Sequence, residues 1–363
     1  MIMNDSLILV INPGSTTSKV ALFRGFKDGV EEKITSTIEH GSEELEGFEK
    51  VADQKNMRLE YIRQFMAKAD VGLTSLDAVV GRGGLLKPIT GGTYRVNEKM
   101  LSHLKQGFQG EHASNLGGLL AHSLAREAKA ESFIVDPVVV DEMVPAAKIS
   151  GSPEFERKSI FHALNQKAVA RRYAGEKDVS YHDLTVIVAH MGGGISVGLH
   201  HEGEVIDVNN ALAGEGPFSP NRAGTLPTLD LAMHCLEENP DPVKMKNKLV
   251  KKSGVVSYLG TNDMKEVEKR AENGDEEAEL IFRAMAYQVA KEIGSLYPPS
   301  PDEPEAILLT GGIAHSDRFT GLVREKVEYI APVRVYPGEE EMKALAQGAN
   351  RVLKGEEEAK TYE

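Results

Sequence analysis

The sequence predicts an α/β protein of two related domains, and three observations support this fold class. The chain has 363 residues, more than one ordinary hydrophobic core usually holds. Short apolar runs of strand length alternate with longer stretches of helical periodicity. Each half contains a strand, a glycine- or serine-rich turn, a second strand and, later, a strand that ends in a glycine pair. We therefore expect two duplicated α/β domains with a ligand cleft between them.

The first half opens with a predicted β-hairpin. The runs Leu7–Ile11 and Val20–Phe23 are apolar, and the residues between them are small and hydroxylated, with Pro13 and Gly14 to form a turn. Backbone N–H groups, hydroxyls and Lys19 in such a turn can bind phosphate oxygens, although a plain hairpin would look the same. Further elements are expected as strands at 32–39, 76–80 and 133–140, the last interrupted by Asp136-Pro137, and as helices at 43–69 and 111–129.

The second half repeats the pattern from residue 184. Strands are expected at 184–189, 195–200, 205–208 and 306–309, and helices at 226–237, 276–296 and 341–353. Glycines follow the first and the last of these strands, at 192–194 and 311–312. The acidic segment 355–363 is expected to be a frayed tail. We place the two domains at residues 1–148 and 149–340.

Composition and charge exclude several classes of protein. The net charge of −13 argues against nucleic acid or an anionic membrane as a partner. The single cysteine, Cys235, excludes an intramolecular disulfide framework and suits a reducing compartment; we expect it to be a buried small hydrophobe. No apolar run reaches membrane-spanning length, and the first residues lack the pattern of a signal peptide. We therefore expect a cytoplasmic protein.

The two common nucleotide-binding motifs are absent from this sequence. It contains neither G-x-x-x-x-G-K-[ST] nor G-x-G-x-x-G, so a phosphate site has to be built from turns after strands, near residues 14, 192 and 311. The pair His200-His201 looks like a metal site only superficially. It lies at a predicted hairpin turn without a spaced third ligand, so we expect both side chains to face solvent.

Seven ordered motifs resemble those of the acetokinase family, in the superfamily of acetate and sugar kinases, chaperone ATPases and actin. The match runs from about Leu7 to Asn350, and the order and spacing of the motifs make it specific. The motifs are Asn12-Pro13-Gly14-Ser15-Thr16-Thr17-Ser18-Lys19, Gly81-Arg82-Gly83-Gly84, Val135-Asp136, Ile160-Phe161-His162, Ala189-His190-Met191-Gly192-Gly193-Gly194, Asn221-Arg222-Ala223-Gly224 and Leu309-Thr310-Gly311-Gly312-Ile313.

This resemblance implies two duplicated ribonuclease H-like domains with the actin-like ATPase fold. It also implies that the C-terminal segment 341–363 returns as a helix to the first domain. The implied activity is reversible phosphoryl transfer between ATP and a short-chain carboxylate, giving ADP and an acyl phosphate, with Mg²⁺ and in a homo-oligomer built from dimers. A nucleotide-gated ATPase like actin or a chaperone is the alternative of another class.

The resemblance also implies roles for individual residues. Four of these residues have an equally ordinary structural role open to them: Arg82 and Arg222 can be surface cations, His162 a core histidine and Asp136 a turn residue. The implied catalytic residues are Arg82, Asp136, His162 and Arg222; the metal-side residues are Asn12 and Glu340, with the adjacent Glu339 and Glu341 as alternatives to Glu340; the nucleotide-binding residues are Lys19, His190, Gly192, Gly193, Gly194, Asp263, Gly311, Gly312 and Ser316.

One departure from the family's pattern bears on acyl-chain length. In acetate kinases two valines typically follow the arginine of the second motif, whereas Gly83 and Gly84 follow Arg82 here. Their missing side chains are expected to open space beside the carboxylate site, with Phe161 as another wall. Each buried methylene of a substrate is worth about 0.8 kcal/mol. We therefore expect butyrate or a branched acid such as isobutyrate as the substrate, with acetate or propionate as the alternative.

Overall fold

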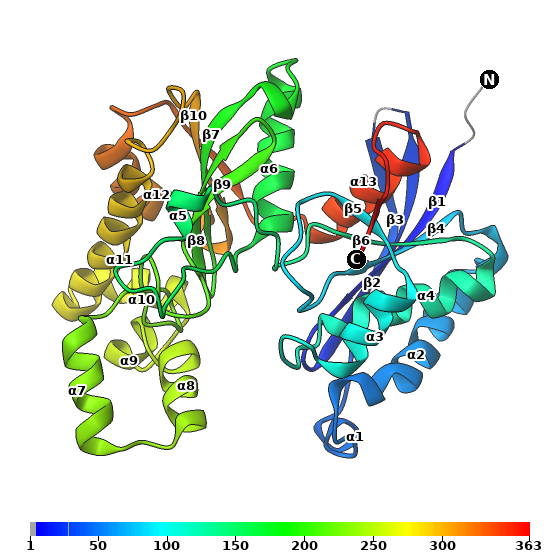
Figure 1. Cartoon of the computed structure of the whole chain (residues 1–363), viewed down its shortest axis with the longest axis horizontal. Helices are drawn as coiled ribbons and strands as arrows, with labels where there is room; N and C mark the ends of the chain where they lie inside the picture. Colours follow the sequence, from blue (N-terminus) through cyan, green and yellow to red (C-terminus); the bar gives the residue numbers. More distant parts are fainter. Residues whose placement is uncertain (1–4, 28) are drawn as a thin grey trace. The chain divides into compact units, whose positions relative to one another are not determined.

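The computed structural model describes residues 5–27 and 29–363 (Figure 1). Contacts between Cα atoms divide the chain into two compact units. The first comprises Met1–Val140 and Glu340–Glu363, and the second Asp141–Glu339. Each unit has a sheet and a hydrophobic core of its own.

The first unit is built on a seven-stranded sheet in the order β12-β5-β6-β4-β1-β2-β3. Strands β1, β2 and β3 are antiparallel neighbours, while β4 and β6 run parallel to β1. The helices α4 and α13 pack on the sheet, so β1 is buried along most of its length and its sequence is a continuous apolar run (Figure 1). The strands are β1 Ser6–Pro13, β2 Thr17–Phe26, β3 Gly29–Glu39, β4 Ala78–Arg82, β5 Thr93–Arg95, β6 Glu131–Val135 and β12 Lys360–Thr361.

The second unit has a five-stranded sheet in the order β11-β10-β7-β8-β9. Strands β7, β8 and β9 form an antiparallel meander, and β10 and β11 continue parallel to β7. This order repeats β6-β4-β1-β2-β3 of the first unit, so the structure contains the duplicated sheet that the sequence predicts. The strands are β7 Thr185–Met191, β8 Ile195–His201, β9 Glu204–Val208, β10 Ala306–Gly311 and β11 Val333–Pro337.

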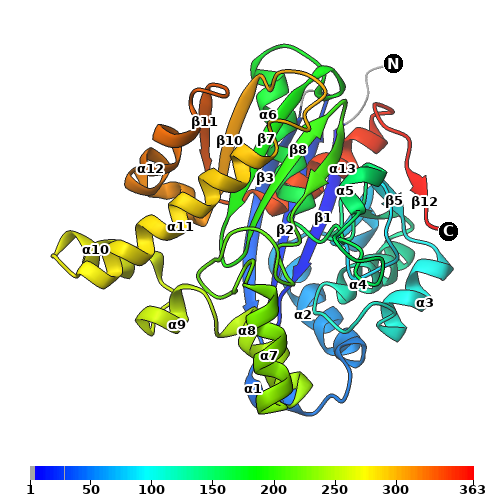
Figure 2. The same cartoon turned by 60° about the vertical axis from the view of Figure 1, so that its left-hand side comes forward.

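Helices surround both sheets. In the second unit α6 contacts β7 and β10, and α11 contacts β7 and β8 (Figure 2). Within the described residues no helix is both long and apolar enough to cross a membrane. The helices are α1 Ser42–Glu46, α2 Lys55–Lys68, α3 Glu98–Gln106, α4 Asn115–Ala128, α5 Pro145–Lys148, α6 Ala163–Glu176, α7 Thr228–Glu238, α8 Pro242–Lys251, α9 Val255–Leu259, α10 Met264–Glu272, α11 Glu276–Ser295, α12 Asp317–Val327 and α13 Glu341–Leu353.

Two predicted elements of the first unit are wrong in extent. The single helix expected at 43–69 is divided into α1, a 3₁₀ turn at Val51–Gln54 and α2. It breaks because α1 ends at Gly47 and Lys50 adopts an extended backbone. The strand expected at 133–140 ends with β6, because Asp136 has a φ of 37° and Pro137 follows it.

The expectation of a frayed C-terminal tail is also wrong. Helix α13 ends at Leu353, and β12 pairs in parallel with β5. Tyr362 is 2% exposed, and its hydroxyl binds His103 Nδ1 at 2.8 Å and accepts from the backbone N–H of Lys87 at 3.1 Å. One buried aromatic side chain therefore anchors a segment that is otherwise polar.

Two predictions about the solvent exposure of side chains in the second unit are wrong. His200 is fully buried rather than facing solvent, and its ring binds the hydroxyl of Tyr181 at 2.8 Å and Gln166 Oε1 at 3.0 Å. Cys235 is partly exposed rather than buried, because α7 has no buried residue. Both faces of β8 are covered, which explains the first error, and His201 at the end of the strand is only 18% exposed.

Candidate active site

Three predicted site residues lie at the carboxyl ends of parallel strands in the first unit. Asn12 is near the end of β1, Arg82 ends β4 and Asp136 follows β6. These strands are neighbours in the sheet, so their ends meet along one edge. Ligands of open α/β sheets bind at such an edge.

A carboxylate that the sequence indicated only as an alternative joins two of these residues. Glu341, the first residue of α13, accepts from Asn12 Nδ2 at 2.8 Å. It also pairs with Arg82 through both oxygens, at 2.9 Å from Nη1 and 2.8 Å from Nη2. The planar guanidinium thus holds a carboxylate in the two-point geometry that suits a carboxylate or phosphate ligand.

Glu340, the residue predicted beside the metal, lies elsewhere. Its carboxylate is 3.5 Å from Lys343 Nζ and its side chain is 56% exposed, compared with 16% for Glu341. The structure therefore places Glu341, rather than Glu340, beside Asn12. Three consecutive glutamates give no local signal for this choice, because it depends on where α13 begins.

The turn between β1 and β2 keeps polar groups at the surface. Gly14 N donates to Thr17 O at 2.8 Å, and the intervening Ser15 and Thr16 are exposed. Lys19 is also exposed and lies opposite Asn12 in the register of the two strands. The turn can thus present a cation, hydroxyls and backbone donors to an anion.

Asp136 has a structural role in this unit. Its carboxylate is 1% exposed and accepts from Gly92 N at 2.6 Å, while its own N–H donates to Gly92 O at 3.1 Å. Its positive φ is a conformation that Asp tolerates better than most residues. The role of a turn residue, left open by the sequence, thus has direct support, and the catalytic role stays a prediction.

The structure does not leave the space that was expected beside Gly83 and Gly84. A Cβ atom on Gly83 would lie 2.5 Å from Pro137 Cβ, and one on Gly84 would lie 2.4 Å from Asn115 Oδ1 and 2.8 Å from Leu104 Cδ2. Neighbouring atoms fill both positions, so the glycines permit close packing instead of opening a hollow. The expectation of added space is therefore wrong.

In the second unit two predicted histidines stack on each other. The rings of His162 and His190 are 3.8 Å apart with an interplanar angle of 14°. His162 Nδ1 lies 2.8 Å from Ser196 Oγ, and His190 Nδ1 lies 2.8 Å from Asn165 Oδ1. The other ring nitrogen of His190, Nε2, lies 3.0 Å from Glu339 Oε1. No pattern in the sequence indicated Asn165 or Ser196, and Glu339 was indicated only as an alternative residue beside the metal.

Glycine-rich segments lie beside these histidines at the carboxyl ends of the central strands β7 and β10. Thr310 pairs with His190 in the register of β10 and β7, so Gly311 and Gly312 lie near the segment 192–194. Gly311 has a φ of 90°, and a Cβ there would lie 2.4 Å from Met191 O. Close backbone approach of this kind is a feature of many phosphate sites, and here it requires glycine.

Arg222 packs across one of these glycines. A Cβ on Gly194 would lie 2.1 Å from Arg222 Nη1, which donates to Ala211 O at 2.6 Å. Burial lowers the pKa of the Arg222 guanidinium. In the part of the chain that the structure describes, no carboxylate pairs with Arg222. Its remaining donors can therefore bind an anionic ligand.

Phe161 and the two residues predicted near adenosine have structural partners. Phe161 is 2% exposed and lies two residues before the first residue of α6. Asp263 caps α10 by accepting from Lys265 N at 2.9 Å. Ser316 caps α12 by accepting from Phe319 N at 3.0 Å. Capping accounts for Asp263 and Ser316 without a ligand, so their nucleotide role stays a prediction.

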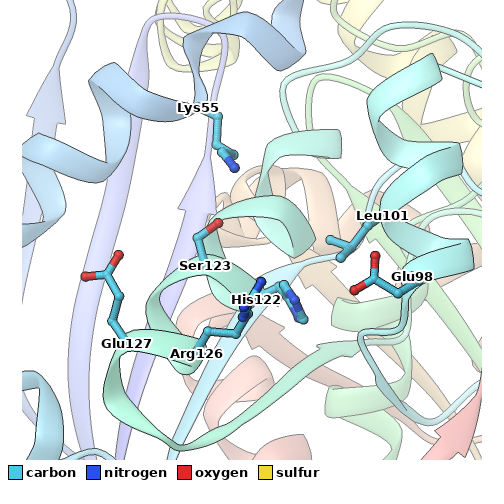
Figure 3. Close-up of a pocket in the computed structure, with 7 residues that line it drawn as sticks. All are labelled: Lys55, Glu98, Leu101, His122, Ser123, Arg126 and Glu127. Atoms are coloured by element: carbon cyan, nitrogen blue, oxygen red, sulfur yellow. The ribbon is translucent and has the colours of Figure 1, made fainter.

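A separate cavity in the first unit, with a volume of about 540 Å³, contains none of the predicted site residues (Figure 3). Two cations and two carboxylates line it, so their charges offset one another. Its lining residues are Lys55, Glu98, Leu101, His122, Ser123, Arg126 and Glu127.

Among residues 5–27 and 29–363 no group of three or more His, Cys, Asp or Glu side chains could hold a metal ion. The oxygens of Asn12 and Glu341 nevertheless fit an Mg²⁺ ion that keeps most of its water.

Comparisons with known proteins identify the family and the fold. The model of the acetokinase family matches residues 154–355. Butyrate kinase 2 of Clostridium acetobutylicum is 52% identical over 355 residues, which cover 98% of this chain and 99% of that protein. The crystal structure of Porphyromonas gingivalis acetate kinase superposes with a TM-score of 0.75 at 18% identity, over 94% of this chain and 98% of that one. A propionate kinase from Francisella tularensis gives a TM-score of 0.73 at 20% identity, with the same coverage. These two structures show that the fold is the actin-like ATPase fold.

Proposed function

The chain belongs to the acetokinase family, and from this premise we propose that it is a carboxylate kinase acting on butyrate. It would transfer a phosphoryl group reversibly between ATP and butyrate, or a branched acid such as isobutyrate, giving ADP and an acyl phosphate. The observation that carries the proposal is the 52% identity with a butyrate kinase over 98% of the chain.

The chemistry of this reaction explains why the proposed residues are mostly cationic. A carboxylate is already ionised near pH 7, so its attack on phosphorus needs no strong general base. It needs neutralisation of its repulsion from the triphosphate, which is largely a matter of electrostatics and positioning. Arg82, Arg222 and His162 would supply positive or polar groups for this purpose, and Lys19 would bind the nucleotide phosphates.

We propose Mg²⁺ as the metal that accompanies the nucleotide. Asn12 and Glu341 would contact its water shell, because the structure joins these two side chains to each other. Glu340, the residue indicated by the motif alone, is the alternative. When bound, Mg²⁺ neutralises charge on the phosphates. The chain's contribution would be to orient that ion through the side-chain oxygens that contact its waters.

The nucleotide itself is proposed to bind along the edge of the second sheet. His190, the glycines of residues 192–194, and Gly311 with Gly312 lie there on neighbouring strands. Asp263 and Ser316 would lie beside adenosine, although both now cap helices.

We also propose that the protein is a cytoplasmic homo-oligomer. Leu229, Met233 and Leu236 of α7 are exposed apolar residues at helical spacing, and apolar residues gathered on one exposed helix face often mark an interface. Light scattering after size-exclusion chromatography would give the number of chains.

A panel of carboxylates tests the main proposal. The purified protein is incubated with MgATP and acetate, propionate, butyrate or isobutyrate, and the acyl phosphate is trapped with hydroxylamine. We expect the highest kcat/KM with butyrate or isobutyrate. Preference for acetate or propionate would support the alternative substrate. ATP hydrolysis without any acyl phosphate would contradict a carboxylate kinase and favour a nucleotide-gated ATPase.

A further inference from the structure

We propose that Arg58 of α2 is a positioning residue that holds the turn between β1 and β2 in a phosphate-binding shape and supplies it with a buried positive charge. The inference rests on the proposed function, because it takes nucleotide phosphate to be the ligand of this turn.

Arg58 binds the turn from its inner side. Its side chain is fully buried, and Nη1 donates to Gly14 O at 3.0 Å, to Thr17 O at 2.7 Å and to Ser18 Oγ at 3.0 Å. Nη2 donates to Ser15 O at 3.2 Å. A single guanidinium thus contacts four of the five residues 14–18.

These contacts orient the backbone of the turn. In a trans peptide the C=O of one residue and the N–H of the next point in opposite directions. Because the carbonyls of Gly14 and Ser15 point toward Arg58, the N–H groups of Ser15 and Thr16 point away from it. Both of these residues are exposed. Successive N–H groups aimed outward form a concave site that favours anions.

Among the described residues, the charge of Arg58 has no acidic partner in direct contact. Its Nε and Nη2 donate to Gln54 Oε1, a neutral acceptor, at 3.2 and 2.8 Å. Glu44 acts on Arg58 only through space, and its carboxylate accepts from the hydroxyl of Tyr61 instead. Burial lowers the pKa of Arg58 to about 10, which still leaves it protonated near pH 7.

A buried cation that lacks a directly contacting counter-ion is costly to fold. His40 does not offset the charge, because its ring binds Ser18 Oγ at 2.9 Å and its pKa is lowered by burial and by Arg58. The positive potential of Arg58 therefore remains behind the turn, where a bound triphosphate would be stabilised by it.

The experiment compares Arg58→Met and Arg58→Lys with a control, Arg63→Met, in the full chain. Arg63 lies on the same helix and forms an exposed pair with Glu127. Affinities for ATP and for adenosine are measured by calorimetry, together with KM for each substrate and the unfolding temperature. Adenosine serves as the probe that lacks phosphates.

We expect Arg58→Met to weaken ATP binding by about tenfold or more, as for loss of a charge-assisted contact, with little change for adenosine. KM for ATP should rise more than KM for the carboxylate. Arg58→Lys should restore part of the ATP affinity, because it keeps the charge but lacks the fork of donors. The Arg63→Met variant should match the original protein.

Equal losses for ATP and adenosine, or a lower unfolding temperature with an unchanged ratio of the two affinities, would show that Arg58 has only a structural role. If Arg58→Met does not fold, the ratio of the ATP and adenosine affinities is measured in Arg58→Lys instead. An unchanged ratio there would contradict the proposal. An original protein that binds ATP but makes no acyl phosphate would contradict the proposed function, while this test of the turn would still be valid.

Discussion

Glu341 contacts two predicted active-site residues of the first unit, Asn12 and Arg82. Its carboxylate accepts from Asn12 and forms a two-point pair with Arg82. An anionic substrate that binds Arg82 must therefore share the guanidinium with Glu341 or displace it. Asn12 and Glu341 would orient a bound Mg²⁺, and with Glu341 in that role the donors of Arg82 would be available to the substrate. Glu341 can thus couple metal binding to the availability of the Arg82 donors for the substrate.

Paired substitutions of Glu341 and Glu340 test this assignment. We expect Glu341→Gln to lower kcat by about a hundredfold or more, the scale for losing one electrostatic group of an active site, and to alter the dependence of activity on Mg²⁺. Glu340→Gln should retain near-normal activity. Initial rates across a magnesium titration would check both. The reverse order of effects would return the metal role to Glu340.

The two arginines are predicted to act through geometry as well as charge. Arg82→Ala and Arg222→Ala should each lower turnover by at least about a hundredfold, because either loss leaves anions unneutralised, while both proteins stay folded. Arg→Lys should recover little, because an ammonium lacks the planar fork of donors. Circular dichroism and steady-state kinetics check the outcome. Near-normal turnover in either alanine variant would mean that this arginine has only a structural role.

At the scale of elements, close packing of α4 on β4 places Arg82. A Cβ on Gly81 would lie 2.1 Å from Gly117 O, and one on Gly117 would lie 2.1 Å from Arg82 O. The backbones of strand and helix are in contact here, and Gly84 meets Asn115 of the same helix. Close packing is therefore enough to explain the glycines that follow Arg82, without a role in the choice of substrate.

Gly84→Val separates packing from acyl-chain selection. We expect it to lower the free energy of unfolding by about 1–3 kcal/mol or more, as for overpacking of a core, and to reduce activity equally with acetate, butyrate and isobutyrate. Denaturant unfolding and kinetics with the three acids measure both. Gly294→Ala is the control, because that site in α11 is open and should be neutral or slightly stabilised. Unchanged stability with a selective loss for the longer acids would restore a role in chain length.

The sequence allowed prediction of the strands more reliably than of the contacts between elements. The runs in β1, β4, β7 and β10 are apolar because both faces of each strand are buried, which local composition reflects. Arg58 carried no comparable signal, because a charged residue in an amphipathic helix usually marks the solvent face. Its contacts with residues 14–18 exist only in the folded unit. The sequence could not distinguish Glu341 from the two glutamates before it, because its contacts with Asn12 and Arg82 also exist only in the folded unit.

At the scale of the whole molecule, the first unit is completed by the end of the chain. Helix α13 packs on β1, β2, β3, β4 and β6, and Asn350 within it donates to Phe26 O at 2.9 Å and accepts from Ser6 Oγ at 3.2 Å. Beyond it, β12 extends the sheet beside β5. Sequence periodicity identified α13 but could not show that β12 forms, since Tyr362 is the only large apolar residue of that tail.

A chain that ends at Glu339 tests this dependence. It keeps all of the second unit but lacks α13 and β12. The first sheet would expose the apolar face that α13 covers, and this loss acts against a usual net stability of only about 5–15 kcal/mol. We expect amide hydrogens of β1, β4 and β6 to exchange rapidly in the shortened chain, whereas those of β7 and β10 stay protected. Hydrogen-exchange mass spectrometry resolves the two sets of peptides. Full protection of β1 and β4 in the shortened chain would mean that the first unit folds without its C-terminal helix.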